Sequence, residues 1–239
     1  APVAGAGRRQ VLYFSGCYAG YIRPQIGIAL VKVLTRLGFR VHTPPQRCCG
    51  LPHLTKGMTA AARDKVRGNL GRWQELLERV DHIVVTCSSC GLALMTEWAY
   101  LLDEVRIGRV ADKVIHASHL IGRLLPTVDL APQRLSAAYH LPCHLKVQAY
   151  SGASLDMLEM VPDLRLNALD SHCCGMAGTW GMAAKNDGLS RVIGSHLIDL
   201  VQRFGADVAV TDCPTCEMQL AQLGGRPVRH PVEIVADCV

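Results

Sequence analysis

Ten of the eleven cysteines follow one pattern that occurs twice. In each copy a lone cysteine comes first, a Cys-Cys-Gly sequence follows, and a Cys-x-x-Cys pair completes the set. Corresponding cysteines of the two copies lie 125 or 126 residues apart, so the register is kept across the whole pattern. Thiols repeated in a fixed order are typical of a duplicated metal-binding pocket. The predicted ligands are Cys17, Cys48, Cys49, Cys87 and Cys90 in the first copy, and Cys143, Cys173, Cys174, Cys213 and Cys216 in the second.

The number of thiols restricts the kind of metal. Five thiolates exceed the four ligands that complete a tetrahedral zinc site or an ordinary cubane iron–sulfur cluster. Neighbouring side chains of an extended backbone point to opposite sides, so Cys48 and Cys49 are expected to reach different metal atoms. The pattern therefore favours an open or irregular iron–sulfur cluster in each copy. A structural or redox-sensing zinc module that uses four thiols per site is the alternative.

Residues beside the cysteines support such a site. Gly50 and Gly175 follow the two cysteine pairs, where the missing Cβ allows a sharp turn and brings backbone amides close to sulfur. The Cys-x-x-Cys pairs are expected to open helices, whose amides favour the thiolate form. Basic residues that could offset the negative charge of the thiolates are Arg47, His53, Lys56, His144, Lys146 and His172. The remaining cysteine, Cys238, is expected to be a free thiol at a mobile terminus.

The elements that must position these cysteines alternate along each half. Apolar runs predict strands at 11–15, 39–43 and 83–86 in the first half, and at 137–140, 164–169 and 208–211 in the second. Helical spacing predicts helices at 24–37, 59–79, 117–125 and 189–204. This order predicts an α/β fold made of two pseudo-symmetric, Rossmann-like repeats with parallel sheets, at 1–126 and 127–239. Because parallel strands deliver ligands beyond their carboxyl ends, the five cysteines of each repeat should converge.

Composition excludes several functions. The net charge of +5 is spread along the 239 residues and aromatic residues make up 5%, which argues against a nucleic-acid partner. No apolar run is long enough for a transmembrane segment, and the first residues do not resemble a signal peptide, so a cytoplasmic protein is expected. The spacing of Gly175, Gly178 and Gly181 does not fit a dinucleotide-binding loop; it predicts a tight loop that encloses the second site. Flavin and nicotinamide are therefore not expected on this chain.

The residues around the cysteines carry a family resemblance over nearly the whole chain. They read PPQRCCGLP at 44–52, TCSSC at 86–90, CCGMAGTWG at 173–181, VTDCPTC at 210–216 and HPV at 230–232. These segments resemble the duplicated cysteine-rich CCG domain. That module is shared by the B subunit of heterodisulfide reductase, lactate-utilisation and glycolate-oxidase iron–sulfur subunits, and the C subunit of anaerobic glycerol-3-phosphate dehydrogenase. The segments are most similar to the C-terminal region of the last.

The resemblance implies two iron–sulfur clusters of the noncubane 4Fe–4S type, each held by one set of five cysteines, although one pocket could hold zinc or a smaller cluster. It implies an electron-transfer subunit or fragment of an oxidoreductase, rather than the substrate-oxidising subunit. Such subunits take electrons from a flavin-bearing glycerol-3-phosphate or related dehydrogenase and pass them toward membrane quinone. Heterodisulfide or thiol reduction at the cluster is the alternative.

The sequence departs from the family pattern in one respect. The C subunit of the glycerol-3-phosphate enzyme has an upstream ferredoxin-like region with its own cysteine runs, and no such runs occur in this sequence. The chain is therefore expected to be the excised C-terminal part of a longer protein. Partner subunits would hold it peripherally at the cytoplasmic face of the inner membrane.

Overall fold

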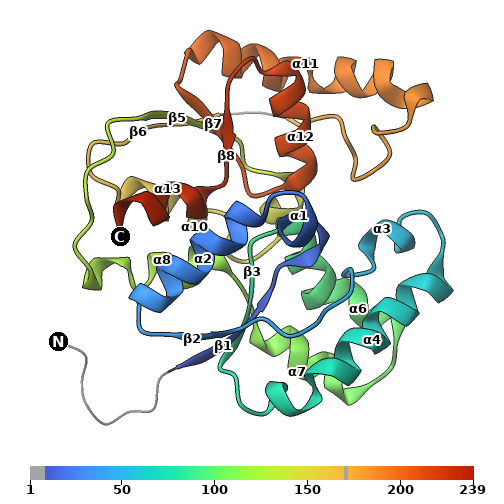
Figure 1. The fold of residues 1–239 in the computed structure, drawn as a ribbon. Helices are drawn as coiled ribbons and strands as arrows, with labels where there is room; N and C mark the ends of the chain where they lie inside the picture. The colour runs from blue at the N-terminus through green and yellow to red at the C-terminus, as the bar shows by residue number, and fades with distance from the viewer. Residues whose placement is uncertain (1–8, 170–171) are drawn as a thin grey trace. The chain divides into compact units, whose positions relative to one another are not determined.

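The structure is a computed structural model that describes residues 9–169 and 172–239. Its contacts divide the chain into two units, Ala1–Val128 and Asp129–Val239, which are called unit 1 and unit 2 (Figure 1). Each unit contains one sheet of four strands, and every strand pairing in both sheets is parallel. The predicted α/β class with two repeated parallel-sheet units is therefore confirmed.

The sheet of unit 1 has the strand order β2-β1-β3-β4. Its strands are β1 (Gln10–Phe14), β2 (Arg40–His42), β3 (His82–Val85) and β4 (Val114–His116). Residues 11–14 of the central strand β1 form an uninterrupted apolar run and are all buried. Such runs are typical of parallel strands that are covered by helices on both faces.

Helices cover both faces of this sheet. In chain order they are α1 (Gly16–Tyr21), α2 (Pro24–Arg36), α3 (Leu51–Leu54), α4 (Thr59–Leu77), α5 (Ser88–Leu92), the π-helix η1 (Ala93–Glu97), α6 (Trp98–Leu101), α7 (Val105–Lys113), α8 (Ala117–Gly122) and the 3₁₀ turn η2 (Leu125–Thr127). Helices α2 and α8 contact each other on one face, and α4 and α7 contact each other on the other (Figure 1). Helix α2 begins with Pro24 in its first turn and is followed by Gly38, whose φ of +86° suits the chain reversal.

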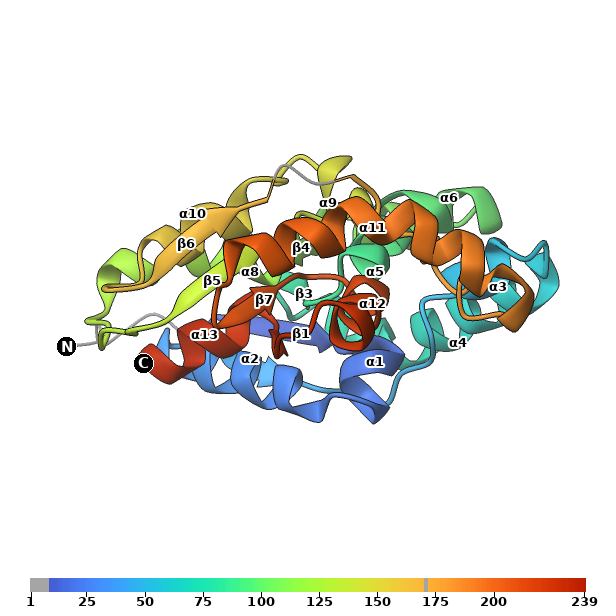
Figure 2. The ribbon, with the colours of Figure 1, turned by 90° about the horizontal axis from the view of Figure 1, so that it is seen from above.

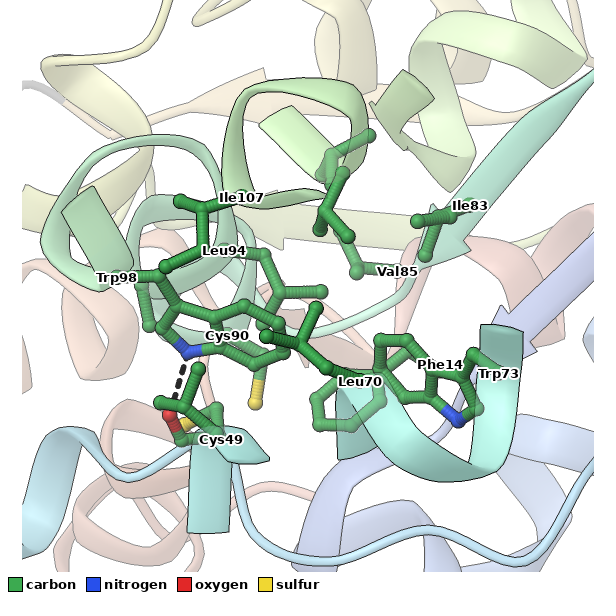
Figure 3. Packing of buried hydrophobic residues seen from close by; sticks show 14 of the residues in the cluster. Phe14, Cys49, Leu70, Trp73, Ile83, Val85, Cys90, Leu94, Trp98 and Ile107 are labelled. Carbon is green, nitrogen blue, oxygen red and sulfur yellow. Dashed lines mark hydrogen bonds between the residues drawn. The ribbon is translucent and has the colours of Figure 1, made fainter. Parts of the chain in front are cut away.

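An aromatic stack forms the core beneath the α4 face (Figure 3). The ring of Phe14 meets Trp73 edge-on at 5.5 Å, and Trp73 stacks on Trp98 at 5.9 Å. Each such pair contributes about 0.5–1.5 kcal/mol beyond the burial of its area. Buried cysteines 49, 87 and 90 belong to the same apolar cluster, so this core directly supports the cysteine-rich edge.

Unit 2 repeats the arrangement with the strand order β6-β5-β7-β8. Its strands β6, β5 and β7 are labelled in Figure 2. Its strands are β5 (Ser136–Tyr139), β6 (Arg165–Ala168), β7 (Val208–Val210) and β8 (Val228–Arg229). Its helices are α9 (Cys143–Lys146), α10 (Ala153–Glu159), the 3₁₀ turn η3 (Ala184–Asn186), α11 (Asp187–Phe204), α12 (Pro214–Leu223) and α13 (Pro231–Cys238). Helices α11 and α12 pack against one face of the sheet, where Leu197 and Leu220 join the core. Helices α10 and α13 contribute Leu158 and Ile234 to the other.

The structure departs from the expected elements at short segments. A fourth strand in each sheet, β4 and β8, was not expected, because two or three residues are too few to show a strand pattern. The expected mobile terminus is wrong at Cys238, which is buried in α13 and donates a hydrogen bond to the Ile234 carbonyl at 3.2 Å. Among the helices of residues 9–169 and 172–239, none combines the length and apolar character needed to cross a bilayer.

Candidate metal centres

The five cysteines of unit 1 come together as a row of touching thiols. Cys17 hydrogen-bonds to Cys48, Cys48 to Cys49, Cys49 to Cys90, and Cys90 to Cys87. Cys17 is exposed, Cys48 is half-buried and the other three are buried. The row therefore runs from solvent into the aromatic core.

The thiols of this row lie in the segments that follow the carboxyl ends of three strands. Cys17 lies in the first turn of α1, after β1, and Cys87 is the N-cap of α5, after β3. Cys48 and Cys49 lie in the loop between β2 and α3. The backbone N–H of Cys90 donates to the Cys87 sulfur at 3.4 Å. Gly16, at φ +63°, permits the close approach, because a Cβ there would lie 3.0 Å from the Cys90 sulfur.

Two side chains from the helices hold the backbone of the cysteine pair. Asn69 of α4, which is fully buried, accepts a hydrogen bond from Arg47 N at 2.7 Å and donates to the carbonyl of Cys48 at 3.3 Å. Trp98 of α6 donates from its indole Nε1 to the carbonyl of Cys49 at 2.8 Å (Figure 3). Because buried carbonyls require partners, these two residues fix the direction in which both thiols point.

Unit 2 repeats three of these four contacts in the same register. Cys143 hydrogen-bonds to Cys173, while Cys216 donates to Cys174 at 3.2 Å and also contacts Cys213. Cys143 is exposed, Cys173 is half-buried and the other three are buried. In both units the first member of the vicinal pair contacts the lone cysteine, and the second contacts the last cysteine of Cys-x-x-Cys. The two thiols of each vicinal pair therefore contact different cysteines of their site, although Cys48 also hydrogen-bonds to Cys49.

The thiols change one another's pKa. Hydrogen bonds from Cys17 and then Cys49 hold the pKa of Cys48 well below its usual range, and the hydrogen bond to Cys48 raises the pKa of Cys17. In unit 2 a hydrogen bond from Cys216 lowers the pKa of Cys213 to about 5, with the backbone amides that open α12 contributing less. A proton on one sulfur thus stabilises the thiolate next to it. Metal ions replace such protons when they bind thiolates.

The expected basic neighbours differ in their roles. Arg47 forms an ion pair with Asp64 at 2.7 Å and so points along α4. Hydrogen bonds from Cys17 and Cys49 lower the pKa of Cys48 most, and the nearby His53 lowers it further by a smaller amount. The buried Nδ1 of His53 has no hydrogen-bond partner in the described part of the chain. Burial and the nearby Cys173 raise the pKa of Cys143, and the charge of Lys146 opposes this rise with a smaller effect.

The other three basic residues, Lys56, His144 and His172, are described by their exposure or by contacts with residues other than cysteines. His172 is exposed and its ring lies 4.8 Å from that of His196, His144 accepts a hydrogen bond from Gln148 through its carbonyl, and Lys56 is exposed. Sequence patterns did not reveal Asn69 and Trp98 as supports of the cysteine pair. Asn69 could have been found, because it is a polar residue among the apolar residues on the buried stripe of α4. The sequence contains no comparable signal for the role of Trp98.

The chemistry of this donor set fits an iron–sulfur group. In residues 9–169 and 172–239, no three His, Cys, Asp or Glu side chains surround one point as ligands to a single ion. The thiols of unit 1 instead form a row, and those of unit 2 form two groups, Cys143 with Cys173 and Cys174 with Cys213 and Cys216, an extended arrangement that suits a group with several metal atoms. Backbone N–H groups already point at sulfur, as at Cys87 and at Cys173, which accepts from Gly175 N at 3.3 Å. Such hydrogen bonds adjust the potential of iron–sulfur clusters.

Comparisons with known proteins agree with this geometry. The family model "Cysteine-rich domain", CCG, matches residues 11–95 and 137–221. The C subunit of anaerobic glycerol-3-phosphate dehydrogenase from Escherichia coli K12 is 34% identical over 235 residues, which cover 96% of this chain and 59% of that protein. Lactate utilization protein A of Anoxybacillus flavithermus is 27% identical, covering 94% of this chain and 98% of that protein.

A third relative belongs to a heterodisulfide reductase. The D subunit of dihydromethanophenazine:CoB–CoM heterodisulfide reductase from Methanosarcina barkeri is 25% identical, covering 97% of this chain and 58% of that protein. The chain thus spans 59% of the length of the E. coli relative and 58% of the M. barkeri one. The regions that match the family model contain all ten cysteines of the repeated pattern.

Proposed function

Because the chain belongs to the cysteine-rich CCG-domain family, we propose that it is an iron–sulfur electron-transfer module with one cluster in each repeat, 1–126 and 127–239. The proposed ligands are Cys17, Cys48, Cys49, Cys87 and Cys90 in the first repeat, and Cys143, Cys173, Cys174, Cys213 and Cys216 in the second. One observation carries the proposal: each unit gathers five thiols from three separate segments, and in both units the vicinal pair contacts the lone cysteine through its first thiol and the last cysteine of Cys-x-x-Cys through its second.

The cluster proposed is the noncubane 4Fe–4S type. When bound, an iron–sulfur cluster supplies reversible transfer of single electrons. The residues of this chain bind and orient it: Asn69 and Trp98 fix the first cysteine pair, and the amides of Cys90 and Gly175 donate to sulfur. The buried thiols exclude water from one side of each site. Low solvent exposure and hydrogen bonds to sulfur are the two means by which this protein would set the potential.

We propose a flavin-bearing dehydrogenase as electron donor and membrane quinone as acceptor. The similarity to one component of glycerol-3-phosphate dehydrogenase supports a donor that oxidises glycerol-3-phosphate or a related substrate. The exposed ends of the rows, Cys17 and Cys143, are where electrons would enter and leave. Partner subunits would hold the chain at the cytoplasmic face of the membrane.

The exposed ends also favour a second function, reduction of a disulfide. A small disulfide could reach Cys17 or Cys143 from solvent, whereas the other ligands are half-buried or buried. Two electrons from the cluster sites and two protons would convert the disulfide into two thiols. Similarity to one component of a heterodisulfide reductase supports this alternative.

Rapid mixing distinguishes the two functions. Anaerobically reconstituted protein is reduced with a photoreduced flavin and then mixed with either a soluble quinone or a mixed disulfide of two small thiols. Electron transfer to quinone predicts that the visible absorbance lost on reduction recovers after mixing with quinone and stays bleached after mixing with the disulfide. Recovery with the disulfide alone favours the second function. Protein that binds zinc and no iron contradicts both.

A further inference from the structure

The two repeats differ in charge at one buried position beside the metal centres. The residue before Cys-x-x-Cys is Thr86 in unit 1 and Asp212 in unit 2, 126 residues later. Thr86 directly follows β3 and Asp212 comes two residues after the end of β7, and their exposed fractions are 2% and 0%. Equivalent tyrosines contact them: Tyr13 O–H lies 3.1 Å from the Thr86 hydroxyl, and Tyr139 donates to Asp212 at 2.6 Å. The fold therefore holds a neutral group and a carboxylate in the same place.

Hydrogen bonds hold both oxygens of the Asp212 carboxyl group. Tyr139 donates to Oδ2, and Ser154 of α10 donates to Oδ1 at 2.8 Å. An acceptor of two hydroxyl groups is the role of an ionised carboxylate, and charge-assisted bonds of this kind are the short ones. Burial, and then the Asp212 charge, raise the pKa of Tyr139, so the phenol remains the donor. The site thus places a negative charge one residue from Cys213.

Two further buried positions are also more polar in unit 2 than in unit 1. Position 140 is a buried histidine where the first repeat has Phe14. Burial, and then the charge of Lys146, lower the pKa of His140 to about 4, against the effect of Asp212, so the imidazole is neutral at pH 7. A second buried acid, Glu217, follows Cys216 where the first repeat has a glycine. Unit 2 therefore has an aspartate, a histidine and a glutamate at three buried positions where unit 1 has a threonine, a phenylalanine and a glycine.

We infer that Asp212 lowers the reduction potential of the second metal centre and makes the two centres of one chain electronically unequal. This inference rests on the proposed function, because it requires a cluster on the second set of cysteines. Reduction adds negative charge, and a fixed buried carboxylate opposes that addition. The expected effect of the charge is about tenfold in the one-electron equilibrium constant, which corresponds to about 59 mV.

The first test removes the charge while keeping the shape. In full-length protein carrying Cys48→Ser and Cys49→Ser, only the second centre is expected to bind iron. A redox titration followed by electron paramagnetic resonance then compares this background with and without Asp212→Asn. We expect the variant to be reduced more easily, by about tenfold in the equilibrium constant. Cluster content is measured on the same samples, together with the thermal midpoint of unfolding.

The second test adds the charge where the protein lacks it, and so holds even if Asp212→Asn fails to fold. In full-length protein carrying Cys173→Ser and Cys174→Ser, Thr86→Asp should make the first centre harder to reduce by a similar factor, whereas the neutral Thr86→Asn should not.

The inference is overturned if Asp212→Asn leaves the reduction potential of the loaded second centre unchanged. It is also overturned if Thr86→Asp and Thr86→Asn give the loaded first centre the same potential. Either result leaves the proposed function standing. Changes in thermal stability alone would show that Asp212 only holds Tyr139 and Ser154 in place. Absence of iron from both backgrounds overturns the proposed function together with the inference.

Discussion

Replacing His140 with phenylalanine should remove an acid-sensitive part of the protein's stability. His140 is fully buried, and burial, followed by the charge of Lys146, lowers its pKa from 6.5 to about 4. The folded state therefore resists protonation of this imidazole more than the unfolded state does. Its contribution is fully present above the unfolded pKa of 6.5 and is lost as the pH falls toward 4. Phenylalanine occupies the equivalent position in unit 1, as Phe14, so the fold accommodates that ring.

The size of the effect follows from the two pKa values. At 1.36 kcal/mol per pH unit, protonation should cost the wild-type fold about 2 kcal/mol at pH 5 and about 3 kcal/mol at pH 4, relative to pH 8. His140→Phe lacks this loss, so the difference in unfolding free energy between the two proteins should change by that amount over the same range. Any constant effect of the altered packing cancels in this comparison.

Urea unfolding of metal-free, reduced protein at several pH values between 4 and 8 measures the difference. Metal-free protein is required because protons compete with metal for the thiolates. Substitution of the exposed His196 with glutamine is the control, and its stability should follow the wild-type pH dependence. Parallel stability curves for wild type and His140→Phe, with no convergence or crossing toward pH 4, would refute the reasoning.

Three further substitutions test the supports of the metal centres. Gly175→Ala should destabilise the protein by at least about 1 kcal/mol more than Gly50→Ala; both glycines have φ of +90°, but only at Gly175 would the added Cβ overlap the backbone of α11. Equal losses in urea unfolding would contradict this. Trp98→Phe should cost about 1–3 kcal/mol because it leaves the Cys49 carbonyl without its indole donor; an unchanged unfolding free energy would count against that contact. Cys238→Ala should lower the thermal midpoint yet leave the iron content of reconstituted protein unchanged, and a loss of iron would make Cys238 a ligand.

The sequence predicted the elements that repeat along the chain. The strand predicted at 11–15 contains the apolar run 11–14, and the helix predicted at 24–37 has a proline at its start and a glycine after its end. The register of the cysteines required that both halves fold alike. These signals are local or periodic, so they can be seen without knowledge of tertiary structure.

The parts that the sequence did not predict depend on tertiary contacts. Strands β4 and β8 exist because neighbouring strands offer backbone partners, and they are too short to be recognised alone. Trp98 reaches the Cys49 carbonyl across 49 positions of the chain, a pairing that no motif encodes. The contact between Tyr139 and Asp212, like that between Tyr13 and Thr86 in the other unit, joins residues 73 positions apart and has no local sequence signal.

Iron and acid-labile sulfide in anaerobically prepared protein test the central claim most directly. The measurement compares wild type with Cys49→Ser/Cys90→Ser and with Cys174→Ser/Cys216→Ser. Two independent clusters predict that each double substitution removes about half of the iron and half of the sulfide, and that combining them removes both. Wild-type protein that contains zinc without sulfide, or cysteines joined in pairs as disulfides, would contradict the account.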